Sequence, residues 1–221
     1  MNLILNFLKD LSKNNNREWF NEHKETYRTA LSEFNHQVEK VIIGLGKFDK
    51  NLLNVQAKDT VFRIYKDIRF SKDKTPYKTH FGAYMAKGGR KSQDAAYYMH
   101  IEPEGTFIAA GAYMPDKDRL KALRQEIVYN PDGYMGIVNA CKKKGYAQLI
   151  HEDTLKKAPQ GFSPDFKFLD EIKLKHFIFT RNYSDEEVLS EDFINSVIKD
   201  YRGLYPFNEF LNNAMEFIGN E

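Results

Sequence analysis

The chain has 221 residues, 42% of them hydrophobic, which is the composition of a globular protein rather than a disordered one. Its 33 Lys and Arg nearly balance 31 Asp and Glu, so a formal net charge of +2 gives no global field that would attract nucleic acid or an anionic membrane. The single cysteine, Cys141, excludes a disulfide within the chain and is typical of a reducing compartment. We therefore expect a cytoplasmic protein without a membrane-spanning segment.

Apolar side chains recur at helical spacing in the first part of the chain. A first helix is expected from Met1 to Leu11, where polar residues interrupt the apolar run and no basic region or cleavage site of a signal peptide is present. A second, long helix is expected to begin after Asn15 or Asn16 as N-cap, with Glu18 completing a capping box. The glycines at 44 and 46 are expected to end it.

From Thr60 to Met114 the spacing of apolar residues changes from helical to alternating. The first alternating segment predicts a strand with one face in the core, formed by Phe62, Ile64, Ile68 and Phe70. Further strands are expected at residues 79–86, 95–102, 106–114 and 175–182. Pro103 to Gly105 predicts a hairpin connection between two of them.

Helices return after the strands. The pair Asn130 and Pro131 predicts a helix start, and Ser184 with Glu187 predicts a capping box. Pro206 is expected to separate the last two helices. Because the strands cluster between helices, we expect an α+β fold: a single domain over residues 1–221, with an antiparallel sheet packed on one face by N- and C-terminal helices.

The densest group of polar residues lies in the first predicted strand and just after it. Strand parity places Arg63, Tyr65, Asp67 and Arg69 on one face, opposite the core. Two guanidiniums on one face suit the capture of a phosphate or carboxylate. Asp67 lies between them and is expected to stay ionised, as an orienting acceptor rather than an acid. The predicted ligand-binding residues are Arg63, Tyr65, Asp67, Arg69, Lys74, Tyr77 and Lys78.

Two histidines lie on neighbouring predicted strands. If the protein is an enzyme, His80 or His100 is the expected proton carrier because imidazole titrates near neutrality, and Asp67 is the third candidate. The alternative is that both histidines are partly buried and hydrogen-bonded without a catalytic role. No pair of histidines has local zinc-ligand spacing, so we expect neither bound zinc nor another cofactor.

The central segment also carries a family resemblance. Residues 63–78, from Arg63 through Asp73, Lys74 and Pro76 to Lys78, resemble the signature of a bacterial family called domain of unknown function 2461. Segments 14–20, 111–115 and 158–162 are similar to further landmarks of that family. Where the family resemblance leads us to expect Asp-His-Pro, this chain has Asp-Phe-Lys at 165–167, which argues against a catalytic histidine there. The resemblance implies one full-length domain and no particular activity.

Three functions remain open at this point. The first is binding of a small phosphate- or carboxylate-bearing ligand at the Arg63–Lys78 motif, with or without catalysis. The second is nucleic-acid binding on an open sheet face, which the near-neutral net charge disfavours. The third is a protein-interaction module without chemistry. The motif also has a purely structural interpretation, as a ladder of ion pairs across strands. Ligand identity and oligomeric state are left open.

Overall fold

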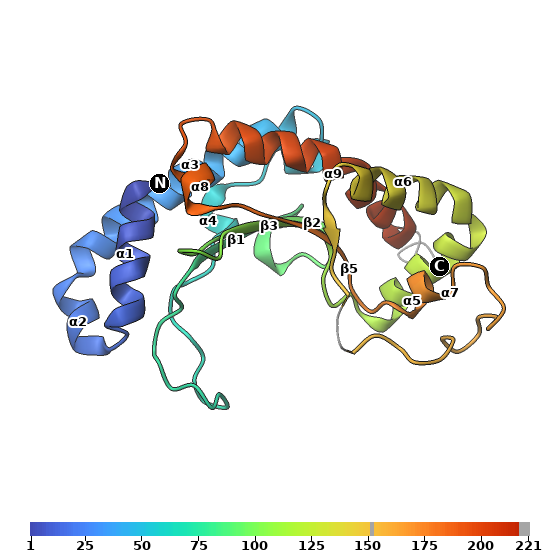
Figure 1. Ribbon diagram of the computed structural model, residues 1–221, viewed down its shortest axis with the longest axis horizontal. Coiled ribbons are helices and arrows are strands. Elements are labelled where there is room, and N and C mark those ends of the chain that lie inside the picture. The colour runs from blue at the N-terminus through green and yellow to red at the C-terminus, as the bar shows by residue number, and fades with distance from the viewer. Residues whose placement is uncertain (151–152, 217–221) are drawn as a thin grey trace. The chain divides into compact units, whose positions relative to one another are not determined.

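The computed structural model describes residues 1–150 and 153–216 (Figure 1). Helices come first, then strands, then helices with two returning strands among them, whereas the predicted order had one returning strand. Contacts divide the chain into two compact units. The first contains residues 1–91, 98–108 and 182–199, and the second contains residues 92–97, 109–181 and 200–221. The expectation of a single domain stays a prediction.

The strands form an antiparallel sheet, which confirms the α+β class. Within the described residues its order is β1-β2-β3-β5-β4. The strand bounds are β1 Phe81–Met85, β2 Ala96–Ile101, β3 Phe107–Ala112, β4 Ala147–Gln148 and β5 Phe177–Asn182. Four of these strands lie inside predicted segments, whereas the two-residue β4 was not expected. No described helix has the length and apolar character required to span a membrane.

The first unit packs its N-terminal helices against the sheet. They are α1 (Asn2–Lys13), α2 (Arg17–Glu22) and α3 (Lys24–Gly46). The prediction of one long helix after Asn16 is therefore wrong at His23, where the chain turns between α2 and α3. Asn16 is the N-cap of α2 and accepts a hydrogen bond from the backbone of Trp19. Phe81 of β1 is 1% exposed and lies between the rings of Phe7 and Phe34, with centroid distances of 6.2 and 5.3 Å.

Short helices complete the first unit. They are η1 (Lys50–Leu52), α4 (Ala57–Thr60), η2 (Gly89–Lys91) and α8 (Asp185–Leu189). The predicted capping box of Ser184 and Glu187 is confirmed at the start of α8. In β2, Met99 and Ile101 are fully buried, whereas Tyr98 on the other parity is partly exposed. This strand therefore has one face in the core and a second face that carries polar groups.

The second unit contains the remaining helices. They are α5 (Lys117–Tyr129), α6 (Pro131–Lys143), α7 (Leu169–Lys173) and most of α9 (Phe193–Glu216). Asn130 and Pro131 begin α6 as predicted. The expected break at Pro206 is wrong, because α9 continues through it. Proline removes one backbone hydrogen bond from a helix, and the fully buried side chains of Leu204 and Phe207 on either side stabilise the continuous helix in its place.

The predicted strand at residues 62–70 is wrong. This segment forms only isolated bridges, from Val61 to Ala83 and from Tyr65 to Tyr77. Figure 1 shows it as part of a long loop that extends from β1, here called the central arm (residues 61–80). The arm's exposure still alternates at its base, where Ile64 is 1% exposed. At its tip Phe70, predicted to be in the core, is 95% exposed.

Candidate functional site

The central arm is anchored to the N-terminal motif through one side chain. The amide of Asn15 donates a hydrogen bond to the backbone oxygen of Tyr77 at 2.9 Å and accepts one from its backbone nitrogen at 3.1 Å. The Tyr77 ring is 3% exposed and stacks on Phe20 at a centroid distance of 4.0 Å. Tyr77, a predicted ligand residue, is therefore part of the packing that holds the arm.

Contacts within the tip of the arm engage three more predicted residues. Arg69 donates two hydrogen bonds to Asp67, at 2.9 and 2.6 Å. These bonds, and to a lesser degree the charge of Arg63, lower the pKa of Asp67, so this carboxylate is ionised and orients Arg69. Lys74 donates to the backbone oxygen of Ile68 at 3.0 Å. Arg69 is thus paired with Asp67 inside the tip.

Two neighbouring cations at the base of the arm have no such partner. Within residues 1–150 and 153–216, the side chains of Arg63 and Lys78 form no hydrogen bond or ion pair. The ammonium of Lys78 is half-buried and lies 5.4 Å from the centroid of the Phe62 ring. Burial, followed by repulsion from Arg63, lowers the pKa of Lys78. The arm therefore holds two neighbouring positive charges, one of them partly desolvated, that no described residue neutralises by an ion pair.

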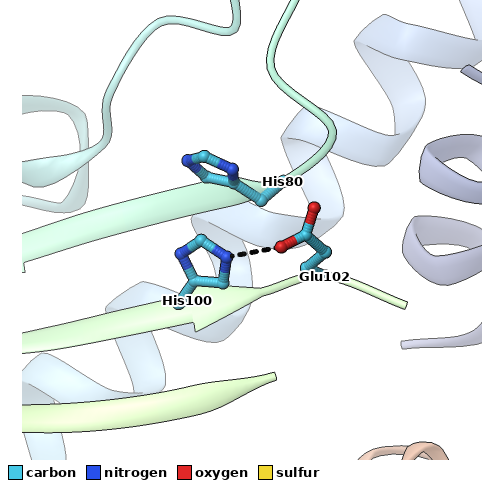
Figure 2. A group of neighbouring side chains, drawn as sticks. All are labelled: His80, His100 and Glu102. Atoms are coloured by element: carbon cyan, nitrogen blue, oxygen red, sulfur yellow. Dashed lines mark hydrogen bonds and ion pairs between the residues drawn. The ribbon is translucent and has the colours of Figure 1, made fainter. Parts of the chain in front are cut away.

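A second polar group lies beside these cations. We call His80, His100 and Glu102 the histidine cluster (Figure 2). His80 precedes β1, while His100 and Glu102 lie two residues apart at the end of β2 and share a face by strand parity. The two imidazole rings are 4.1 Å apart between centroids. The structure thus brings together the histidine pair that the neighbouring strands predicted.

Hydrogen bonds fix the orientation of His100 and Glu102. The Nε2 of His100 lies 3.1 Å from Oε2 of Glu102, and its Nδ1 lies 3.0 Å from the hydroxyl of Tyr98. Thr79 donates to the other carboxylate oxygen of Glu102 at 2.5 Å. His80 differs from His100, because its imidazole has no hydrogen-bond partner among the described residues. The imidazole of His100 is therefore held at both nitrogens, whereas that of His80 keeps a lone pair that no described residue engages.

The environment sets the charge of each member of the histidine cluster. Burial and then the neighbouring His100 lower the pKa of His80 to about 4. Burial also lowers the pKa of His100, although its hydrogen bond to Glu102 acts in the opposite direction. Burial raises the pKa of Glu102, but the bonds from Thr79 and His100 outweigh it and the net shift is downward. At neutral pH the cluster is two neutral imidazoles and one carboxylate.

The depressed pKa of His80 predicts a pH-dependent loss of stability. Its folded pKa, about 4, lies below its unfolded value near 6.5. The unfolded chain therefore binds more protons as pH falls, and the destabilisation is absent above about pH 6.5 and complete below about pH 4. The imidazole is partly exposed, so we expect screening to limit the loss to about 1–2 kcal/mol. Denaturant unfolding of wild type and His80→Gln at pH 7 and pH 4 measures this difference.

A matched control keeps this measurement specific. His36 is an exposed histidine on α3 outside the cluster. We expect His36→Gln to lose stability with acid as the wild type does, whereas His80→Gln loses less. Equal acid sensitivity in all three proteins would contradict the assigned protonation of His80.

Sequence reasoning identified His80 and His100 but missed two residues of this site. Glu102 and Thr79 were not predicted, although both contact or belong to the histidine cluster. The available signal was the two-residue spacing of Tyr98, His100 and Glu102 in a predicted strand, which places all three side chains on one face.

Comparison with known proteins supplies a family. No curated protein and no solved structure matches the chain. A family model described as "Conserved hypothetical protein (DUF2461)" matches residues 3–210, which include the central arm, the histidine cluster and most of both compact units. This match covers most of the chain and confirms the resemblance of the central motif. The chain therefore belongs to the DUF2461 family of conserved hypothetical proteins.

Proposed function

We propose that this protein binds a small anionic ligand, bearing a phosphate or carboxylate group, between Arg63 and Lys78 beside the histidine cluster. One observation carries the proposal: Lys78 is a half-buried ammonium next to a second cation, and no described residue pairs with either side chain. A desolvated charge without a partner destabilises a fold. A bound anion would neutralise both groups and remove their mutual repulsion.

The chemistry of the two cations suits such a ligand. Arg63 presents a planar guanidinium that can bind two oxygens of a phosphate or carboxylate at once, and Lys78 adds a point charge on a flexible stem. Phe62 lies against Lys78 and supplies an apolar wall. The proposal does not use Asp67, Arg69, Lys74 and Tyr77, which are engaged in contacts within the arm or its anchor. Their role as ligand residues stays a prediction, as does that of Tyr65.

Titration with simple anions tests this function. Inorganic phosphate, pyrophosphate and citrate are titrated into wild type and into Lys78→Met, with heat of binding as the readout. We expect Lys78→Met to weaken binding by at least about tenfold, which corresponds to about 1.4 kcal/mol. The unfolding free energy should not fall, because methionine fills the space of the lysine stem without the buried charge. Arg63→Gln should weaken binding in the same direction.

Lys72→Met is the matched control for charge. Lys72 is exposed in the same arm, so its replacement removes an equal charge without touching the Lys78 environment. We expect its affinities for the three anions to equal those of the wild type. If Lys72→Met and Lys78→Met weaken anion binding equally, the effect comes from the loss of one positive charge anywhere in the arm, and a defined site is rejected. A loss of several kcal/mol of stability in Lys78→Met would instead mark this lysine as structural.

A further inference from the structure

The histidine cluster has the composition and spacing of a metal site. One nitrogen of His80, one nitrogen of His100 and one oxygen of Glu102 all lie within 4.8 Å of one another. Figure 2 shows His80 above His100, with the carboxylate of Glu102 beside both rings. Metal ligation requires neutral imidazoles and an ionised carboxylate, because a proton on either ligand atom competes with the metal. The cluster holds these forms at neutral pH without any rearrangement of charge.

The surroundings of the cluster also match those of a metal site. Ligating histidines and carboxylates are usually held by outer hydrogen bonds that fix their orientation. Tyr98 lies at Nδ1 of His100, and Thr79 bonds one oxygen of Glu102. These two contacts leave Nε2 of His100 and the second carboxylate oxygen of Glu102 directed at each other. His80 adds an imidazole that no described residue engages by a hydrogen bond.

We propose that His80, His100 and Glu102 bind one divalent first-row transition-metal ion. Two imidazoles and one carboxylate suit zinc and ferrous iron better than calcium or magnesium, which prefer oxygen ligands. Three protein ligands leave at least one coordination position for water or an anion, as in catalytic rather than structural sites. The expectation of no zinc was drawn from local spacing alone. It does not apply to ligands that come from the neighbouring segments of β1 and β2.

The proposal explains a feature that a purely structural cluster leaves without purpose. A hydrogen-bonded His100–Glu102 pair would be complete with Tyr98 and Thr79 as its partners. It would not require a second imidazole 4.1 Å from the first that no described residue engages by a hydrogen bond. A metal ion gives His80 a partner and offsets the cost of burying it. This inference stands on the cluster's own geometry and does not rest on the proposed anion ligand.

Metal titration of the untagged protein tests the site. After chelator treatment and removal of the chelator, Zn²⁺ and Co²⁺ alone are titrated into the wild type, with calorimetry for stoichiometry and the visible spectrum of Co²⁺ for coordination. We expect one equivalent to bind and to raise the unfolding temperature. His80→Ala and Glu102→Gln should each weaken binding by at least about a hundredfold, since losses of 10–100-fold already follow from outer contacts.

Two controls distinguish the loss of a metal-ligating side chain from the loss of the folded structure. Glu102→Gln keeps the size of the side chain and an oxygen for Thr79, and circular dichroism in chelator should show it folded. His36→Ala removes an exposed imidazole and should bind Zn²⁺ like the wild type. Absence of one-equivalent binding in the wild type, or equal affinity in wild type and His80→Ala, would overturn the proposal and leave a hydrogen-bonded cluster only.

The metal titration and the anion titration can reject their two proposals separately. Lys78→Met leaves all three metal ligands in place, so it should still bind one equivalent of Zn²⁺. Metal binding without anion binding would reject the proposed function and support the metal site. Anion binding that depends on Lys78, in a protein that binds no metal, would support the proposed function and reject the metal site.

Discussion

Replacing Gly111 with alanine should lower the free energy of unfolding by at least about 4 kcal/mol, a loss found only for severe local damage. Gly111 lies in β3 with a φ of +137°, which side chains other than hydrogen rarely allow. A Cβ atom at this position would overlap the backbone oxygen of Phe177 in the neighbouring strand β5. The energetic cost of the backbone strain adds to that of the overlap, and β3 and β5 would have to move apart to relieve the overlap. Denaturant unfolding measures the loss.

Gly136 provides the matched glycine. It is exposed within α6, and a Cβ there would meet nothing within 4 Å. Gly136→Ala should therefore raise stability by about 0.5–1 kcal/mol, the usual gain from alanine in a helix. The two substitutions add the same methyl group and are expected to act with opposite sign. A loss below about 1 kcal/mol for Gly111→Ala would mean that β3 and β5 do not approach this closely.

Phe81→Ala should lower the unfolding free energy by about 3–5 kcal/mol, the range for truncating a buried aromatic residue. Its ring is 1% exposed and contacts the rings of Phe7, Tyr27 and Phe34. Truncation removes apolar burial and leaves a cavity where β1 meets the N-terminal helices. Thermal and denaturant unfolding of the variant give the magnitude.

Phe70→Ala is the contrasting substitution. The sequence pattern placed Phe70 in the core, whereas its ring is 95% exposed at the tip of the central arm. We expect a change within about 0.5 kcal/mol, as for other surface positions. A loss of several kcal/mol would show that the tip packs against the protein in solution and would restore the original prediction.

The sequence predicted the fold class and most strands because burial dictates their pattern. A strand with one face in the core must alternate apolar and polar side chains, and in β2 the apolar Met99 and Ile101 alternate with the partly exposed Tyr98 and with His100. The central arm shows why alternation alone is insufficient. Ladder pairing needs a donor and an acceptor from each partner, and Pro76 has no N–H to give. The backbone nitrogen and the hydroxyl of Thr75 donate hydrogen bonds to the carboxylate of Asp73, and these bonds turn the opposite side of the arm into a loop.

The candidate site was predicted only in part, for a related reason. Charge density drew the prediction to Arg63 and Arg69, but sequence does not show which charges pair with each other. In the fold Arg69 is paired with Asp67, and Lys78 is left with Arg63 as a neighbouring cation. Glu102 lies near His80 only because β1 and β2 are neighbours in the sheet. A single sequence reveals the face on which a side chain lies, but not the partner across from it.

The bond between Asn15 and Tyr77 has a consequence for the whole arm. A side-chain amide that both gives and takes a hydrogen bond with one residue's backbone copies the peptide group of an adjoining strand. Asn15 therefore takes the place of a neighbouring strand beside Tyr77, where the arm also pairs with itself through the bridge from Tyr65 to Tyr77. Lys78 directly follows Tyr77 in the chain. Asn15, 63 residues earlier, therefore restrains the backbone from which the Lys78 side chain extends. The N-terminal segment is therefore part of the scaffold that positions the central arm.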